Sequence, residues 1–396
     1  MSKCLVPMGE FDINTKQQLK YSAYFADESI TDVYEEDGKL VVEHTSDDGT
    51  ILQKIGRLVE RFTEHQFVFK ENVIFENSCQ VPNKDNIIEV LRARKIIKEL
   101  EAGIYTFREP FTTLLRFFDS RFVDRIGKAF NASEEYYPVI INVDTLNKTN
   151  HFTSFPEHIQ FVTHLREDLD IIDGFAGSVH ASGGINSGME MDMDRNMKRP
   201  GHAINPATCY HCYEALQNET LEGEGRAVTA VSKAHRYESR NHKDFGRLLD
   251  FTMREIIFIG TPSFVKENRM KSLQMLMDII REWELDCFIE NANDPFFTKD
   301  YKVKASFQRT QEMKYEVRLN IPYLNRSIAV ASSNFHSNTF GKAFSITAGG
   351  RPAVTGCLAF GLERWVLAFL AQYGLEDAEW PERLYNEWSE WRERYA

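Results

Sequence analysis

The sequence predicts a large protein that mixes helices and strands, and three observations support this. The chain has 396 residues, which at roughly 100–200 residues per domain indicates two domains, or one large domain with an appendage. Apolar residues recur at helical spacing over 51–65, whereas 39–44 and 228–259 have the composition of strands separated by polar turns. Hydrophobic residues at 42% and charged residues at 27% exclude a disordered or collagen-like chain.

The first part of the chain, residues 1–101, is expected to be a small mixed α/β region. A strand is predicted over 39–44, since Gly38 and the polar run 46–49 bound it. Amphipathic helices are predicted over 51–65 and over 87–100, the second closed by Gly103. The polar face of the second helix is basic. It could be an ordinary solvated face or a docking surface for an acidic partner, and its cations are Arg92, Arg94, Lys95 and Lys98.

The second part, residues 102–396, is expected to form the main domain. Met189 to Asp194 alternates methionine with acids, and we expect a mobile surface loop there rather than a metal site. Trp388 and Trp391 are expected to pack the last helix onto the body. The predicted order is a helix over 109–131, a strand over 137–141, a loop-like stretch over 176–202, two strands within 228–259, a helix over 264–283, strands up to 358, and helices over 362–373 and 381–395.

Composition and charge also bound the class of protein. No apolar run reaches the 18 or so residues of a transmembrane helix, and the first 18 residues lack a secretory signal pattern. Six cysteines are few for this length, which fits a reducing, cytoplasmic compartment. The formal net charge of −12 argues mildly against a nucleic-acid binder, which usually shows a basic footprint.

The polar hairpin within 228–259 concentrates chemistry on one side. Because side chains alternate along a strand, Arg236 and Glu238 share one face of the first strand, and Arg247, Phe251 and Glu255 share one face of the second. Arginine can fork a phosphate, phenylalanine can stack on a base, and a carboxylate can accept from an exocyclic amine. The residues alone leave open a nucleotide site or a solvated face.

A second element, 355–365, runs from a strand of small residues into a mostly apolar helix. Gly356 and Gly361 would let a ligand approach the backbone closely, and Arg364 falls in the first helical turn, where anions are favoured. Such a turn is a weak signal when taken alone.

Together these two elements resemble motifs 2 and 3 of class II aminoacyl-tRNA synthetases, and the segment containing Pro138 and Pro156 resembles motif 1, which forms dimers. The resemblance covers roughly residues 102–373. It implies an α+β fold, with an antiparallel sheet of six or seven strands flanked by helices, preceded by the small N-terminal α/β region. It also implies a homodimer.

Within this class the sequence is most similar to the zinc-dependent seryl branch. That resemblance implies a catalytic Zn²⁺ on Cys209, Glu255 and Cys357, with one position left for the substrate amino group. The residues alone also allow two buried free thiols, or a role for the pair Cys209 and Cys212; His202 and His211 are further candidates. A structural zinc would need a second Cys-x-x-Cys pair, and the sequence has none.

Further segments resemble the amino acid:carrier protein ligases, homologues that lack a tRNA-binding domain. These segments are 154–156, 292–297, 314–316 and 333–336. The resemblance implies a ligase that activates a small amino acid with ATP and passes the aminoacyl group to the phosphopantetheine thiol of a carrier protein, with tRNA an improbable partner. It places Lys314, Glu316 and Asn334 at the amino-acid pocket.

The same resemblance assigns roles to the hairpin residues. Arg236 would bridge the substrate carboxylate and the α-phosphate, Arg364 and Arg247 would hold the outer phosphates, and Glu238 and Phe251 would fix adenine. Mg²⁺ would accompany ATP, although the strand 331–334 lacks the acidic ligand usual in the class. Two alternatives stay open: a seryl-tRNA synthetase that charges tRNA, and a non-catalytic regulatory paralogue.

Overall fold

The computed structural model describes residues 2–8, 11, 13–63, 72–185, 193–243, 246–292 and 312–395. Its N-terminal unit packs two helices on a small antiparallel sheet of order β1-β3-β2. Helix α2 buries Ile51, Ile55, Leu58 and Phe62, whose spacing of three or four residues gives it one apolar face. The unit comprises β1 (Ser2–Pro7), α1 (Ile13–Ala23), β2 (Ile30–Glu36), β3 (Lys39–His44) and α2 (Asp48–Thr63).

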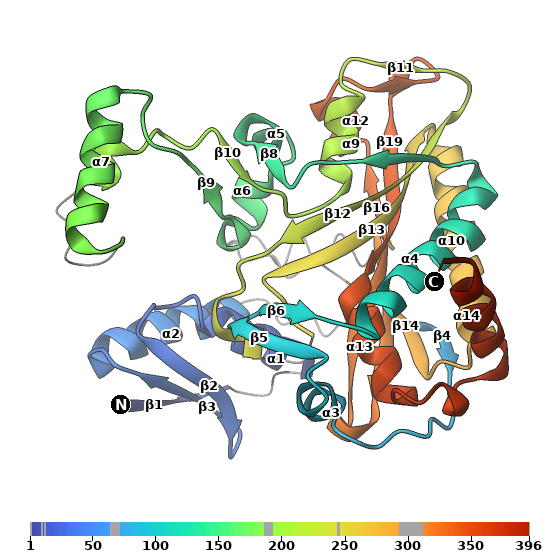
Figure 1. Ribbon diagram of the computed structural model, residues 1–396, viewed down its shortest axis with the longest axis horizontal. Helices are drawn as coiled ribbons and strands as arrows, with labels where there is room; N and C mark the ends of the chain where they lie inside the picture. The colour runs from blue at the N-terminus through green and yellow to red at the C-terminus, as the bar shows by residue number, and fades with distance from the viewer. Residues whose placement is uncertain are drawn as a thin grey trace.

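A sheet of eight strands forms the centre of the molecule (Figure 1). Every neighbouring pair is antiparallel except β12 and β7, which pair in parallel at one edge. In spatial order the strands are β4 (Val73–Asn77), β14 (Cys287–Asn291), β15 (Lys314–Ile321), β16 (Arg326–Ser337), β19 (Val354–Gly361), β13 (Asp250–Gly260), β12 (Gly225–His235) and β7 (Ser133–Tyr136). The predicted antiparallel sheet is therefore present, with one more strand than expected.

Long helices cover one face of this sheet and bury its largest core. Phe122 stacks on Phe360 with ring centroids 3.9 Å apart, and Trp283 and Trp365 are fully buried beside them. The expected packing of Trp388 and Trp391 is confirmed, since both are buried. The helices are α4 (Phe111–Arg125), α10 (Pro262–Glu282), α13 (Leu362–Tyr373) and α14 (Glu382–Tyr395).

Short elements surround the opposite face, and a second core lies beneath them. Cys209, Tyr213 and Phe340 pack there against Cys357 and Ile257 of the sheet. The helices of this region are α5 (Val143–Lys148), α6 (His151–Ser154), α7 (Leu169–Ser182), α8 (Met193–Asn196), α9 (Cys209–Ala215) and α12 (Thr339–Ala343), with strands β8 (Ile140–Asn142), β9 (Phe161–Val162), β10 (His202–Ile204), β11 (Thr220–Leu221), β17 (Thr347–Ala348) and β18 (Arg351–Pro352).

The predicted helix over 87–100 is only half correct. Helix α3 (Ile87–Ala93) ends because Lys95 adopts a left-handed backbone, with φ of 59°. The chain then forms a hairpin of β5 (Ile97–Glu101) and β6 (Ile104–Phe107), with Gly103 at φ 79° in the turn. Apolar residues at 96, 97 and 100 fit both structures, so periodicity could not separate them.

The expectation of a loop over 176–202 is also wrong in its first part. Helix α7 continues to Ser182, starts on an Asp168 cap, and projects away from the sheet (Figure 1). Its glycines suggested a loop, but the Asp168 side chain accepts from the backbone of Asp170 and Ile171. Residues 189–192 of the methionine–acid run lie outside the described residues.

Other predictions need smaller changes. The predicted strand over 137–141 is wrong for 137–139, which connect β7 to β8 through Pro138, and only Ile140 and Ile141 are in a strand. The predicted helix over 109–131 consists of α4 followed by a 3-10 turn, η1 (Gly127–Phe130). Further 3-10 turns are η2 (Pro156–His158), η3 (Ser239–Lys243), η4 (Pro322–Leu324) and η5 (Asp377–Glu379). No helix in the described part of the chain is long and apolar enough to cross a membrane.

Candidate functional site

A cavity of about 1130 Å³ lies over the face of the sheet opposite the long helices. Register places its lining side by side: Lys314 pairs with Asn334, and Asn334 with Cys357, across β15, β16 and β19. A second row joins Glu316, Ser332, Ala359 and Glu255. Residues far apart in sequence therefore meet because alternate positions of neighbouring strands face the same side.

The hairpin residues form the positively charged end of the cavity. Glu238 is buried, and its Oε2 lies 2.6 Å from Nη1 of Arg247. Burial alone would raise the pKa of Glu238, but the charges of Arg247 and Arg364 outweigh it and lower that pKa to about 2. This end therefore combines the Glu238 carboxylate with the guanidinium groups of Arg247 and Arg364. The guanidinium groups could bind an anionic ligand, and the carboxylate could accept a hydrogen bond from an amino group of the same ligand.

Hydrogen bonds fix Arg364 and the residue before it, Glu363, at the start of α13. Arg364 Nε donates to the carbonyl of Gly246 at 2.7 Å, while burial lowers the pKa of Arg364 to about 10, so it stays charged at neutral pH. The preceding residue, Glu363, is buried and accepts hydrogen bonds from the backbone and hydroxyl of Thr252 on β13, each at 2.7 Å. The start of α13 is thus fixed to the hairpin that carries Arg236.

Phe251 differs from the other predicted nucleotide-binding residues. It does not line the cavity, and the Arg236 guanidinium lies 5.5 Å from its ring centroid. Arg236 also donates from Nε to the carbonyl of Pro206 at 3.1 Å. In this structure, therefore, arginine rather than a base covers the ring of Phe251.

The opposite end of the cavity gathers sulfur and carboxylate groups. Cys209, Glu255 and Cys357 are buried, and the two thiols hydrogen bond to each other. Glu255 Oε1 accepts from the backbone N–H of Cys209 at 3.2 Å, whereas its Oε2 is buried with no hydrogen-bond partner. Burial raises the pKa of Glu255. A buried carboxylate oxygen without a partner beside two thiols fits a metal ion, and this donor set suits zinc.

The other candidates near this end do not reach the cavity. Cys212 is buried three residues beyond Cys209, but it contacts Tyr137 and does not line the cavity. His211 lies beside Glu214, with Nδ1 3.8 Å from Oε2, and His202 is exposed on β10. None of these three lines the cavity in the described part of the chain.

The predicted amino-acid residues lie between the two ends. Asn334 donates from Nδ2 toward Cys357 Sγ at 3.5 Å, which places its amide beside the sulfur–carboxylate group. Lys314 Nζ lies 3.1 Å from Glu316 Oε1, and Glu316 also accepts from Arg318 at 2.9 Å. Of the predicted segment 292–297, residues 293–297 lie outside the described residues.

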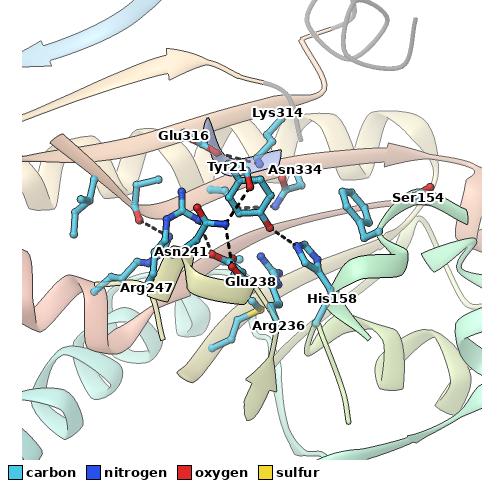
Figure 2. A pocket seen from close by; sticks show the side chains of 18 of the residues that line it. Tyr21, Ser154, His158, Arg236, Glu238, Asn241, Arg247, Lys314, Glu316 and Asn334 are labelled. Carbon is cyan, nitrogen blue, oxygen red and sulfur yellow. Dashed lines mark hydrogen bonds and ion pairs between the residues drawn. The ribbon is translucent and has the colours of Figure 1, made fainter. Parts of the chain in front are cut away.

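The N-terminal unit supplies residues that the sequence did not suggest. The Tyr21 hydroxyl lies 3.2 Å from Nε2 of His158, and the Arg247 guanidinium lies 5.2 Å from the Tyr21 ring centroid. Figure 2 shows Tyr21 above Glu238 and Asn241, with its hydroxyl directed toward His158. Asn241 in η3 donates to the Tyr21 carbonyl at 3.2 Å. No sequence motif covered this region, so only the contact itself reveals Tyr21.

Comparison of the sequence with known proteins identifies relatives of this chain. No family model matches the chain. It is 29% identical over 300 residues to a type-2 serine–tRNA ligase of Methanothermobacter thermautotrophicus, covering 74% of this chain and 58% of that protein. A type-2 serine–tRNA ligase of Methanococcus aeolicus is 27% identical over 308 residues, covering 76% of this chain and 58% of that protein. The chain therefore spans less than two thirds of the length of these relatives.

Solved structures agree with these relatives. The seryl-tRNA synthetase of M. kandleri, solved in complex with A. aeolicus tRNASec, superposes with a TM-score of 0.74 at 21% identity, covering 98% of this chain and 77% of that one. The chain has a class II aminoacyl-tRNA synthetase fold. The seryl-tRNA synthetase of Pyrococcus horikoshii, solved with ATP, superposes with a TM-score of 0.56 at 14% identity, covering 86% of this chain and 80% of that one.

The relatives overturn the prediction about the acceptor. We expected a carrier protein with a phosphopantetheine thiol and regarded tRNA as an improbable partner. That prediction is wrong: the relatives are named serine–tRNA ligases, and one structural neighbour is a tRNA complex. The net charge is weak evidence about such a partner, because −12 is a sum over 396 residues, whereas phosphate contacts depend on local charge.

Proposed function

We propose that this chain is a ligase of the type-2 seryl-tRNA synthetase kind: it activates serine with ATP as seryl adenylate and transfers the seryl group to tRNA. One observation carries the proposal. A single cavity has the fixed set Arg236, Glu238, Arg247 and Arg364 at one end and Cys209, Glu255 and Cys357 at the other. The identity of 29% to a type-2 serine–tRNA ligase supports the choice of serine and of tRNA.

Activation requires the serine carboxylate to attack the α-phosphate of ATP, with pyrophosphate leaving. The carboxylate is already a nucleophile, so no general base is needed and the residues act by positioning and by charge. Arg236 would hold the carboxylate against the α-phosphate, while Arg364 and Arg247 would hold the outer phosphates. Glu238, which stays ionised because its pKa is about 2, would accept from the adenine amino group.

Phe251 would stack on adenine only after the guanidinium of Arg236 leaves its ring. The two now lie 5.5 Å apart, and Arg236 would turn toward the phosphates. Mg²⁺ would come with the nucleotide. The strand 331–334 offers no carboxylate, and the cavity carboxylates Glu290 and Glu316 are both engaged by Arg318.

Cys209, Glu255 and Cys357 would hold Zn²⁺, which when bound supplies a Lewis-acid position for a neutral amino group. Asn334, beside the Cys357 sulfur, would orient the bound amino acid, and Lys314 and Glu316 would line its pocket. A small substrate fits this arrangement because the small side chains of Ser332 and Ala359 lie between Glu316 and Glu255 in the second row.

The N-terminal unit and its surroundings would receive the acceptor end of tRNA. Cationic side chains line the cavity where this unit meets the hairpin: Lys20, Arg240 and Arg326. Local positive charge of this kind attracts a polyanion even on an acidic protein.

The deciding experiment is ATP–pyrophosphate exchange over a panel of amino acids, followed by charging of total tRNA with the substrate identified. We expect exchange that depends on serine, and aminoacylation of tRNA that is lost when the metal is removed by a chelator and returns with Zn²⁺. Exchange with serine but no charging of any tRNA would overturn the acceptor. Exchange with another amino acid alone would overturn the substrate.

The motif 2 assignment has its own test in Arg236→Ala. Since Arg236 would act in the transition state of the first step, we expect at least a hundredfold loss of exchange, of the order of that for one oxyanion donor, with an unchanged melting temperature. Arg281→Ala, an exposed arginine on α10, is the matched control. Exchange by Arg236→Ala within a few-fold of wild type would refute the assignment.

A further inference from the structure

A second group of metal-ligating side chains lies in the N-terminal unit, away from the cavity. Cys4 comes from β1, His44 from the end of β3 and Asp48 from the start of α2, three elements that meet beside the N-terminus in Figure 1. One ligand atom from each residue lies within 4.8 Å of the other two. These residues line no part of the cavity over the large sheet.

The geometry of this group differs from that of a hydrogen-bonded relay. Cys4 Sγ lies 3.1 Å and Asp48 Oδ1 lies 3.5 Å from the same atom, Nε2 of His44. In a catalytic triad the nucleophile and the carboxylate bind opposite nitrogens of the imidazole. Here both converge on one nitrogen, which is the arrangement that ligands of a common ion adopt.

The opposite nitrogen fixes the orientation of this imidazole. His44 Nδ1 lies 3.2 Å from the carbonyl oxygen of Ser46, which can only accept, so Nδ1 carries the hydrogen. Nε2 is therefore the nitrogen that faces both Cys4 and Asp48. A cation bound between the sulfur, this nitrogen and the carboxylate would contact all three groups at once. Metal-bound histidines typically donate their second N–H to a carbonyl or carboxylate in this way.

The distances fit a zinc-type ion. Bonds of about 2.3 Å to sulfur and about 2.0–2.1 Å to nitrogen and oxygen at tetrahedral angles place sulfur about 3.5 Å and oxygen about 3.3 Å from the nitrogen. The observed 3.1 and 3.5 Å differ from these values by a few tenths of an ångström. Mixed sulfur, nitrogen and oxygen ligands favour Zn²⁺ over Mg²⁺ or Ca²⁺.

Burial indicates how the coordination would be completed. Cys4 is 4% exposed and His44 is fully buried, whereas the Asp48 side chain is 59% exposed. The open side next to Asp48 leaves room for a water as the fourth ligand. We propose that Cys4, His44 and Asp48 bind a divalent metal ion of the zinc type, which ties the first strand to β3 and α2. This proposal does not depend on the proposed catalytic function.

Metal content of the full chain tests this site. We expect wild type loaded with Zn²⁺ and desalted to hold one equivalent more than Cys4→Ser. Because Cys209→Ser removes a ligand of the other proposed site, it should lose a different equivalent and keep the one at Cys4. Cys79→Ser, a thiol outside both groups, is the control and should match wild type. Equal zinc in Cys4→Ser and wild type would overturn the proposal, whatever Cys209→Ser shows.

A spectroscopic measurement covers the case in which Cys4→Ser fails to fold. Asp48→Asn changes an exposed side chain and should fold normally. In the Cys209→Ser background, Co²⁺ should give a thiolate-to-cobalt absorption band and raise the melting temperature. The further change Asp48→Asn should weaken Co²⁺ binding by about tenfold or more, the order of effect of altering a metal-site partner. Absence of the band, or an unchanged affinity in Asp48→Asn, would contradict the site.

Discussion

Charge compensation around Glu238 is the most sharply defined feature at the residue scale. The carboxylate is buried and lies 2.6 Å from Arg247, with Arg364 also close enough to lower its pKa. Burying a charged group costs the free energy of its hydration, and a protein tolerates this only where opposite charges and hydrogen bonds surround the group. Losing the carboxylate would leave the positive charges of Arg247 and Arg364 without this compensating negative charge, since each of them lowers the pKa of Glu238.

This predicts a stability that depends on pH. The folded pKa of Glu238, about 2, lies below the value of about 4.3 for an unfolded glutamate. Its contribution is therefore present above about pH 4.3 and is lost as pH falls toward 2. Glu238→Gln should lower the free energy of unfolding by about 2 kcal/mol at pH 7, and this difference should shrink in acid. Urea unfolding at several pH values measures it.

The exposed Glu390 on α14 offers the control for that experiment. Glu390→Gln should differ from wild type by a small amount that does not change with pH, because surface substitutions away from special features have little effect. A difference between Glu238→Gln and wild type that stays constant from pH 7 to pH 3 would show that the carboxylate is not held by the arginines.

Single residues also show where sequence reasoning reaches its limit. The motif positions all line the cavity: Arg236, Glu238, Arg364, Cys209, Glu255 and Cys357. Strand alternation and register explain this for Glu255 and Cys357. The predicted strand face of Arg236 and Glu238 is wrong, since β12 ends at His235. Phe251 does not line the cavity, because the position of the Arg236 side chain depends on packing that no motif encodes. Tyr21 reaches the cavity from a different unit, and nothing in its local sequence distinguishes it from a core tyrosine.

At the scale of elements, the hairpin turn η3 is tied to the N-terminal unit by three hydrogen bonds. Asn241 donates to the Tyr21 carbonyl, Ser239 to the Tyr24 carbonyl and Arg240 to the Thr31 carbonyl. The turn lies between Arg236, which follows β12, and Arg247, which precedes β13. Its position therefore depends on a unit that the class II motifs do not include.

We predict that Asn241→Ala raises the KM for ATP several-fold in the exchange reaction, while the melting temperature stays within a few degrees of wild type. The substitution frees the turn from α1 without removing a charged group. Gln274→Ala on the exposed side of α10 is the control. If the KM is unchanged in Asn241→Ala, the N-terminal unit does not position the hairpin.

The pair β16 and β19 depends on a close approach that only glycine allows. A Cβ on Gly356 would lie 2.8 Å from the carbonyl oxygen of Asn334, at the register position next to Cys357. Gly356→Ala should therefore push the strands apart, lower the melting temperature, and reduce zinc retention at Cys209, Glu255 and Cys357. Differential scanning calorimetry and metal analysis of the same sample measure both effects.

Gly56 in the middle of α2 provides the opposite case. A Cβ there meets nothing within 4 Å, so Gly56→Ala should stabilise the helix by about 0.5–1 kcal/mol.

A Gly356→Ala variant as stable as wild type would contradict the prediction for β16 and β19, because it would mean that the strands accommodate the added methyl group. Glycine positions such as these are visible in the sequence, but which one needs the missing side chain depends on strand pairing.

The same limit explains the errors among the elements. The stretch 94–101 is not helical because Lys95 has a left-handed backbone conformation. The periodicity of apolar residues does not reveal such an interruption. Helix α7 formed in spite of its glycines because Asp168 caps it. The long helices α10 and α13 and the hairpin of β12 and β13 were predicted well, because their patterns extend over many residues.

For the whole molecule, the sequence resemblance predicts a homodimer through the segment that contains Pro138 and Pro156. The exposed hydrophobic side chains support this prediction, because several gather within residues 136–185. Tyr136 is 88% exposed on the edge strand β7, Phe161 is 55% exposed on β9 and Leu169 is 71% exposed on α7. Helix α7 has no buried residue at all, although its composition is largely apolar. Apolar surface concentrated in this way is typical of an interface.

We therefore expect the protein to sediment as a dimer at micromolar concentration in analytical ultracentrifugation. Phe161→Glu combined with Leu169→Glu should shift it to the monomer, because burying two carboxylates in an apolar contact costs more than a typical interface of about 800 Å² per partner can offset. Leu100→Glu, at a residue 57% exposed outside this segment, should leave the dimer intact. A wild-type monomer would mean that the segment is covered in another way, and a dimer that survives both glutamates would place the contact on a different face.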